Sequence, residues 1–90
     1  MNATTWQRSD HWVGTQIDDS FVMLDFEGGT YVSLNKTATD VWNALEQPTD
    51  AANIVGVLTE RYDVSGEDCA AAVDRVLADF QTKRLIQPVR

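Results

Sequence analysis

The side chains that most often carry catalysis or bind metals are sparse in this 90-residue sequence. His11 is the single histidine and Cys69 the single cysteine, and neither has a second metal-type ligand at a suitable spacing. The sequence contains no glycine-rich phosphate loop, no nucleophile elbow and no H-E-x-x-H motif. Carboxylates scattered along helical patterns are a weak signal for acid-base catalysis. The residues therefore predict a protein that is not an enzyme and that binds no metal or cofactor.

Charge and composition narrow the class of partner. With 14 acidic and seven basic residues the net charge is −7, so the field around the molecule repels phosphate backbones and anionic lipid headgroups. Nucleic acids and membranes are thus poor partners. One cysteine cannot form an internal disulfide, and no apolar run approaches the length of a membrane span or the pattern of a signal peptide. These features predict a cytoplasmic protein.

The elements that would position a binding site centre on residues 21–45. Two strand-like runs, 21–26 and 30–34, are joined by Glu27-Gly28-Gly29, a sequence typical of a tight hairpin. Residues 11–17 could add a preceding strand, which gives a three-stranded antiparallel meander. Residues 1–10 are polar apart from Trp6 and have no periodicity, so they predict a flexible tail ahead of a single domain at 11–88.

Apolar residues at helical spacing predict three helices after the strands. The first begins near Asn35 or Thr37, with Thr37 and Asp40 as a capping pair, and ends before Pro48. Thr49 or Asp50 would cap the second helix, and Ser65 together with Asp68 the third. Strands followed by helices indicate an α+β fold in which the helices cover one face of the sheet.

The third strand of such a meander lies at an edge. An uncovered edge presents free N–H and C=O groups, to which an extended peptide can add as a further strand. The strand order therefore permits an extended peptide to add at the third strand.

The same residues resemble a known family. The pattern consists of an apolar strand, a glycine turn, Tyr-x-x-Leu-Asn at 31–35, Val41-Trp42, the run 54–62 and a long third helix. It is similar to the PqqD-like family, the RiPP recognition elements, which are small winged-helix-like domains that bind leader segments of ribosomally made, modified peptides. The similarity covers about residues 11–88. Its most specific part, 31–42, looks most like the free-standing leader-binding proteins of lasso-peptide pathways.

Three positions depart from the family pattern. Pro48 stands where a glycine is common, and Arg84 replaces a usual glycine before the final Leu-Ile pair, which indicates altered turns. Ala72 occupies a position that is often acidic in relatives, so the departure bears on leader preference.

The resemblance implies where a leader would bind and which enzymes would process the precursor peptide. The leader would lie along the third strand and against the third helix, with Val76 and Phe80 as an apolar floor and charged residues as a rim. The implied site residues are Thr30, Tyr31, Val32, Ser33, Leu34, Asp68, Ala72, Arg75, Val76, Asp79 and Phe80. The implied partners are a precursor leader peptide and a leader peptidase, with an ATP-using macrocyclase downstream. A match to the wider family alone would instead imply a radical SAM enzyme as the client.

Six of the implied site residues also have an ordinary structural interpretation. Val76 and Phe80 fit plain core packing, and Tyr31 could cover its neighbouring strand. Asp68 could be only a helix cap, while Arg75 and Asp79 have the i, i+4 spacing of a surface pair. A second functional class, a winged-helix DNA-binding regulator, is disfavoured by the net charge. The open edge is compatible with a monomer or with a weak homodimer.

Overall fold

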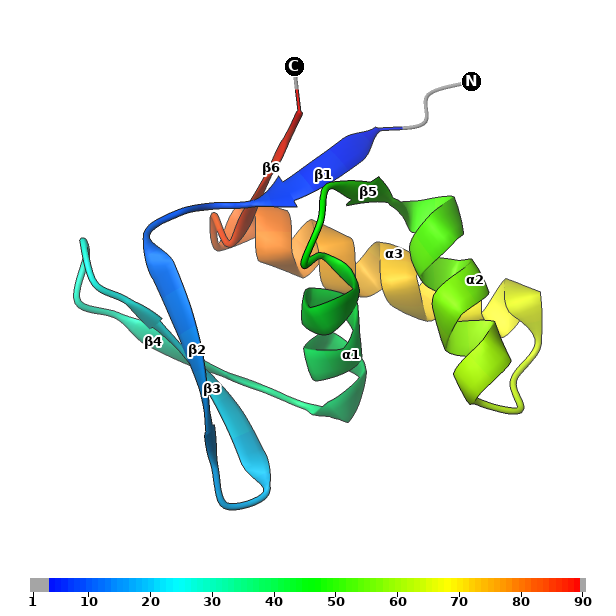
Figure 1. The fold of residues 1–90 in the computed structure, drawn as a ribbon, viewed down its shortest axis with the longest axis horizontal. Coiled ribbons are helices and arrows are strands. Elements are labelled where there is room, and N and C mark those ends of the chain that lie inside the picture. Colours follow the sequence, from blue (N-terminus) through cyan, green and yellow to red (C-terminus); the bar gives the residue numbers. More distant parts are fainter. Residues whose placement is uncertain (1–3, 90) are drawn as a thin grey trace.

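The computed structural model describes residues 4–89, which form two small sheets and three helices (Figure 1). In chain order the elements are β1 (Thr5–Arg8), β2 (Trp12–Ile17), β3 (Ser20–Asp25), β4 (Tyr31–Leu34), α1 (Lys36–Ala44), β5 (Thr49–Asp50), α2 (Ala51–Arg61), α3 (Gly66–Thr82) and β6 (Ile86–Pro88). The predicted α+β class, the three-stranded meander and the three helices are all confirmed. No helix within residues 4–89 is long and apolar enough to cross a membrane.

The meander is antiparallel in the order β2-β3-β4 and buries one face. Side chains alternate between the two faces of a strand, so each row of cross-strand partners lies on one face. The row of Gly14, Met23 and Val32 faces the core, and Met23 is fully buried. A Cβ added at Gly14 would lie 2.5 Å from the ring of Phe21, so the absent side chain at this position makes room for that ring.

The expectation of a flexible tail is wrong for the residues that form β1. This strand is the central member of a second sheet in the order β5-β1-β6, and Trp6 pairs with Thr49 on one side and Pro88 on the other. Sequence periodicity could not reveal β1, because its two partners lie more than 40 residues away and are themselves very short. Residues 1–3 of the expected tail lie outside the described residues.

Arg8 anchors β1 to the first helix. Its guanidinium lies over the Trp42 ring, 4.3 Å from the centroid, and donates a hydrogen bond to the Trp42 carbonyl oxygen at 2.6 Å. Partial burial lowers the pKa of Arg8 from its ordinary value, an effect that a nearby Glu46 partly opposes. Because an arginine remains protonated over the working pH range, this contact persists as a cation–π pair.

Polar side chains at the N-caps begin all three helices. Asn35 caps α1 by accepting a hydrogen bond from the Ala38 N–H, so the expected Thr37 and Asp40 cap is wrong. Asp40 is instead buried, where it accepts a 2.7 Å hydrogen bond from the Tyr62 hydroxyl and lies 3.6 Å from Arg61. Asp50, one of the two residues expected, caps α2, and Ser65 caps α3 as the sequence predicted.

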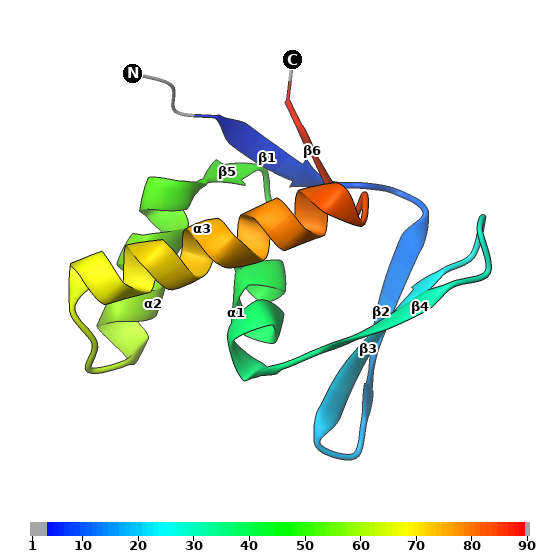
Figure 2. The same cartoon turned by 180° about the vertical axis from the view of Figure 1, so that it is seen from behind.

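One hydrophobic core joins the meander to the helices. Figure 2, the view from behind, shows α3 in front of α1 and the meander beside these two helices. Phe80 of α3 is fully buried and meets Trp42 of α1 edge to face, with 6.2 Å between ring centroids. The helices thus cover the inner face of the meander, and its β4 edge lies at the side of the molecule.

The C-terminus of α3 ends in a left-handed turn at Arg84. The Leu85 N–H bonds to the Phe80 carbonyl and the Arg84 N–H to the Gln81 carbonyl, which is the hydrogen-bond pattern of a Schellman motif. Arg84 has φ 64°, a conformation that glycine adopts without a steric penalty. The turn geometry is therefore the one that glycine favours, although an arginine occupies the position.

Arg84→Gly is expected to stabilise the fold by about 1 kcal/mol, because glycine relieves the contact between Cβ and the carbonyl in the left-handed region. Chemical denaturation measured by circular dichroism would test this. Lys83→Gly is the matched control, because Lys83 has φ −86° and should lose stability on the same change. Equal destabilisation by both variants would contradict the interpretation.

Candidate functional site

Strand β4 lies at one edge of the meander. Strand β4 pairs with β3 on one side and has no strand partner on the other within residues 4–89. The Asp25 N–H donates to the Thr30 carbonyl at 2.8 Å, which identifies Asp25 and Thr30 as a hydrogen-bonded pair. Alternation along an antiparallel ladder then makes Val32 and Leu34 the next residues that bond to β3.

Tyr31 and Ser33 therefore direct their N–H and C=O groups to the open side. A hydrogen bond between β3 and β2 agrees with this register. The N–H of Phe26, the residue after Asp25, donates to the His11 carbonyl on the β2 side. Two residues with both groups free offer up to four main-chain hydrogen bonds to an added strand. Sequence alone left open which residues of β4 face outward, and the register decides it.

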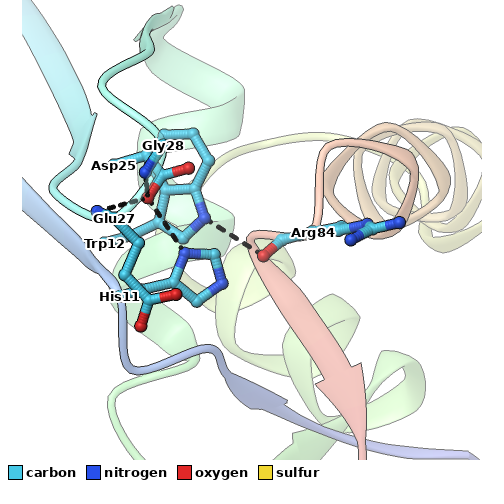
Figure 3. Close-up of polar contacts among 6 residues, drawn as sticks. All are labelled: His11, Trp12, Asp25, Glu27, Gly28 and Arg84. Carbon is cyan, nitrogen blue, oxygen red and sulfur yellow. Dashed lines mark hydrogen bonds and ion pairs between the residues drawn. The ribbon is translucent and has the colours of Figure 1, made fainter.

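A compact polar cluster fixes the turn that leads into β4. Figure 3 shows the Asp25 carboxylate accepting hydrogen bonds from the Glu27 N–H and the Gly28 N–H, each at 3.0 Å. His11 Nδ1 lies 3.1 Å from the same carboxylate oxygen. Gly29, with φ 78°, completes the turn. Trp12 Nε1 donates to the Arg84 carbonyl at 3.1 Å and so ties β2 to the end of α3 (Figure 3).

The pKa of Asp25 lies below its ordinary value of 3.8, chiefly because the Gly28 N–H bonds to the carboxylate, with further contributions from His11 and Glu27. A depressed pKa in the folded state adds stability above pH 3.8 that is lost as the pH falls through the folded value. We expect the wild-type chain to lose more stability between pH 5 and pH 2 than Asp25→Asn, in which this group does not titrate. Denaturant melts at each pH would measure the difference, and parallel pH profiles would refute it.

A mostly apolar pocket lies beyond the C-terminal end of β4. Its volume is about 360 Å³, and it opens among the N-terminus of α1, the end of α2 and the N-terminal half of α3. The residues that line it are Lys36, Thr37, Asp40, Leu58, Tyr62, Val64, Asp68, Cys69, Ala72 and Val73. The Lys36 ammonium lies 5.3 Å from the centroid of the Tyr62 ring at the polar side. The pocket can hold an apolar side chain with one polar group at its rim.

A second, more polar hollow lies at the opposite end of β4. It has a volume of about 660 Å³ and brings β4 together with the C-terminal end of α3. The lining residues are His11, Trp12, Asp25, Glu27, Gly28, Thr30, Tyr31, Val32, Lys83 and Arg84. The open edge therefore runs between an apolar pocket and a polar hollow.

The residues expected on α3 are divided between exposed and buried positions. Asp68 and Ala72 line the apolar pocket, while Arg75 and Asp79 are exposed further along the helix and Val76 is half-buried. Their spacing of three and four residues places them on the helix face that continues toward Lys83. Lys83 forms a 3.1 Å ion pair with Asp79, so the expected pairing of Arg75 with Asp79 is replaced by a pair with Lys83.

Two expected site residues cannot present their side chains to a ligand. Phe80 is fully buried against Trp42, so its assignment to an open groove is wrong and it supports the helix from within the core. Leu34 is likewise buried, and its backbone faces β3. The ordinary interpretation of Phe80 as a core residue is the correct one, because it continues the buried stripe of Cys69, Val73 and Leu77.

Sequence reasoning missed the residues that build the apolar pocket from the other helices. Leu58, Tyr62, Val64 and Lys36 line the pocket, and none of them is among the site residues that the sequence implied. The signal that could have drawn attention to them is Asp40, a carboxylate placed among buried positions of the first helix. Within residues 4–89 no three His, Cys, Asp or Glu side chains are grouped to hold a metal ion.

Comparison with known proteins identifies the fold. The family model described as "Coenzyme PQQ synthesis protein D (PqqD)" matches residues 20–86. The structure described as "TbiB1 in Complex with the TbiA(beta) Leader Peptide" is similar, with a TM-score of 0.81 and 26% identity over 93% of this chain and 98% of that chain. "Lasso peptide synthetase B1 complexed with the leader peptide" has a TM-score of 0.80 and 23% identity over 92% and 98% of the two chains. No curated protein matches the sequence.

Proposed function

The chain belongs to the PqqD family, and from this we propose that it is a RiPP recognition element that binds the leader segment of a ribosomally made precursor peptide. The observation that carries the proposal is the open β4 edge, where Tyr31 and Ser33 have outward backbone groups between two hollows. The similar structure of TbiB1 with a leader peptide supports the same function.

Strand direction predicts how the leader would lie. Strand β4 runs from the polar hollow, at Thr30, toward the apolar pocket, beyond Leu34. A peptide that pairs antiparallel with β4 would have its N-terminal end at the apolar pocket and its C-terminal end at the polar hollow. In this arrangement an apolar leader side chain occupies the pocket near Ala72, and a later polar residue lies near Lys83 and Arg84.

The role proposed here is delivery and not catalysis. A domain that holds the leader raises the local concentration of the rest of the precursor at a processing enzyme, so weak contacts between that enzyme and the core segment are sufficient. The likeness to lasso-peptide proteins favours a leader peptidase as this enzyme. The family description, which concerns coenzyme PQQ synthesis, favours a second candidate, delivery to a radical SAM enzyme.

A matched pair of substitutions on α3 tests the binding site. Ala72 lines the apolar pocket, whereas Ala71 is exposed and absent from that lining. Ala72→Glu should weaken leader binding by about tenfold, because it places a carboxylate against the mostly apolar wall. Ala71→Glu carries the same change in charge and helix composition and should bind like the wild type.

The measurement is a fluorescence-anisotropy titration of a labelled leader peptide from the neighbouring precursor gene, with a scrambled peptide as the negative control. Wild-type binding that is equally strong for the scrambled peptide would overturn leader recognition. Equal affinities of Ala72→Glu and wild type would leave leader recognition standing but remove the apolar pocket from the site.

A further inference from the structure

The apolar pocket has one polar end, which Asp40 and Tyr62 build. Tyr62 directly follows α2, and its hydroxyl donates a 2.7 Å hydrogen bond to the Asp40 carboxylate on α1. The other carboxylate oxygen of Asp40 lies 3.6 Å from the Arg61 guanidinium. Asp40 is only 9% exposed, and a buried carboxylate is stable when its oxygens have partners. Because both oxygens are already engaged, Asp40 does not need a further counter-ion.

Lys36 lies beside this polar end, at the mouth of the pocket. Its ammonium is 5.3 Å from the centroid of the Tyr62 ring, and both residues line the pocket. Lys36 is exposed and comes two residues after the last residue of β4. It also lines a third hollow of about 350 Å³, which opens between the β2-β3 hairpin and the start of α1. A cation therefore lies where a leader paired with β4 would pass from the open edge into the pocket.

Lys36 has no carboxylate partner among residues 4–89. Asp40 and Asp68 line the same pocket and Asp19 lines the third hollow, yet the ion pairs in this part of the chain do not include Lys36. Helix stability does not explain its position either. Lys36 is the first residue of α1, whose first turn contains no acid, and a cation there opposes the helix dipole. Apart from its contact with the Tyr62 ring, the ammonium is thus free to bind a ligand.

We propose that Lys36 binds a carboxylate of the leader, so that the ligand is a leader segment with an aspartate or glutamate beside the apolar residue that fills the pocket. This inference rests on the proposed leader-binding function. In the antiparallel arrangement the acidic residue lies on the N-terminal side of the apolar residue, because Lys36 lies beyond Leu34 in the direction of β4.

The net charge of the chain makes this single cation decisive for selection. At −7, the molecule repels acidic peptides, and the acids that line the pocket and the third hollow add to that repulsion locally. An acidic leader residue is therefore accepted only where a cation meets it. Since Lys36 is exposed, the pair changes leader affinity by about fivefold, the effect typical of a surface ion pair.

Lys36→Gln tests the inference, with Asn43→Asp as the matched control. Both changes lower the charge of α1 by one, but Asn43 is exposed on the same helix and does not line the pocket. The probe is the labelled leader peptide from the neighbouring precursor gene, titrated by fluorescence anisotropy at low salt. We expect Lys36→Gln to bind about fivefold more weakly and Asn43→Asp to stay within about twofold of the wild type. The difference should shrink at high salt, because salt screens an exposed pair.

Charge reversal on both partners identifies the leader residue. Each aspartate or glutamate of the leader is replaced in turn by lysine, and every peptide is titrated against the wild type and Lys36→Glu. One replacement, next to an apolar leader residue, should weaken binding to the wild type and restore binding to Lys36→Glu, as a direct pair requires in a double-mutant cycle. If no replacement restores binding, Lys36 does not bind a leader carboxylate and the inference is wrong.

Two further measurements exclude a role of Lys36 within the fold. Asp19→Asn removes the acid that shares the third hollow with Lys36, so it should bind the leader at least as tightly as the wild type. Weaker binding would show that the two residues act together and would contradict the inference. Lys36→Gln should also unfold at the same denaturant concentration as the wild type. A loss of stability together with affinity would assign Lys36 to support of the Tyr62 ring instead.

The same titrations separate this inference from the proposed function. A wild-type chain that binds no leader overturns the proposed function itself. Normal leader binding by the wild type, with equal affinity for Lys36→Gln, overturns only the contact between Lys36 and a leader carboxylate. Tight binding of a leader in which every acidic residue has been replaced by its amide would overturn the contact in the same way.

Discussion

Ser33→Pro is expected to lower leader affinity by at least about tenfold while the chain stays folded. The Ser33 N–H faces the open edge in the register of β3 and β4, so a proline there removes no bond within the sheet. It does remove one of the two outward donors and places its ring where the added strand would lie. Leader titration by fluorescence anisotropy, with circular dichroism melts of the same samples, measures both effects.

Two further variants give the prediction its controls. Ser33→Ala keeps the backbone donor and should bind like the wild type, which separates the main chain from the hydroxyl. Val32→Pro removes a donor that bonds to β3 and should cost about 1–3 kcal/mol of stability, because the Met23 carbonyl loses its partner. If Ser33→Pro is folded and binds the leader normally, strand addition at β4 is wrong.

The leader peptide offers an independent probe of the same geometry. N-methylation at successive leader residues should weaken binding at every second position, since alternate N–H groups of an antiparallel strand face its partner. A uniform effect along the leader would show that the peptide does not bind as a strand.

Deletion of residues 1–8 is expected to lower the free energy of unfolding by about 3–5 kcal/mol, the loss typical of removing a large packed aromatic side chain. The deletion removes β1, the central strand of its sheet, together with Trp6, which packs against the core. It also removes the guanidinium of Arg8 from the Trp42 ring and carbonyl. A flexible tail would instead leave stability unchanged.

Point substitutions test whether the strand pairing of β1, and not only the presence of residues 1–8, stabilises the fold. Gln7→Pro lies within β1 and should destabilise the fold, because a proline in a strand paired on both sides removes a ladder bond. Thr4→Pro, just before β1, should be close to neutral. Guanidinium denaturation of the two point variants and of the deletion variant would measure these losses of stability. A Gln7→Pro variant as stable as the wild type would show that β1 contributes little to the stability of the fold.

Local patterns in the sequence determined much of the fold. Helical spacing predicted three helices, and the glycine turn with its flanking apolar runs predicted the β3-β4 hairpin. Ser65 caps the third helix as expected, and Asp50 is one of the two caps expected for the second. The family resemblance rested on the same patterns, and the match over residues 20–86 confirms it. These features are local, since caps, turns and periodicity depend on residues within a few positions of one another.

Long-range pairing was decided by the tertiary structure alone. Nothing near Trp6 in the chain shows that Thr49 and Pro88 flank it, so β1 looked like a tail. The direction of the Ser33 N–H depends on the register between β3 and β4, and the apolar pocket combines residues from three helices. Burial decided the position of Phe80 in the core, because a helical stripe alone does not say which neighbours cover it. The sequence by itself thus determined the three helices and the strands of the meander and indicated a peptide as the partner. The second sheet of β1, β5 and β6, the open edge and the two hollows came from contacts between distant segments.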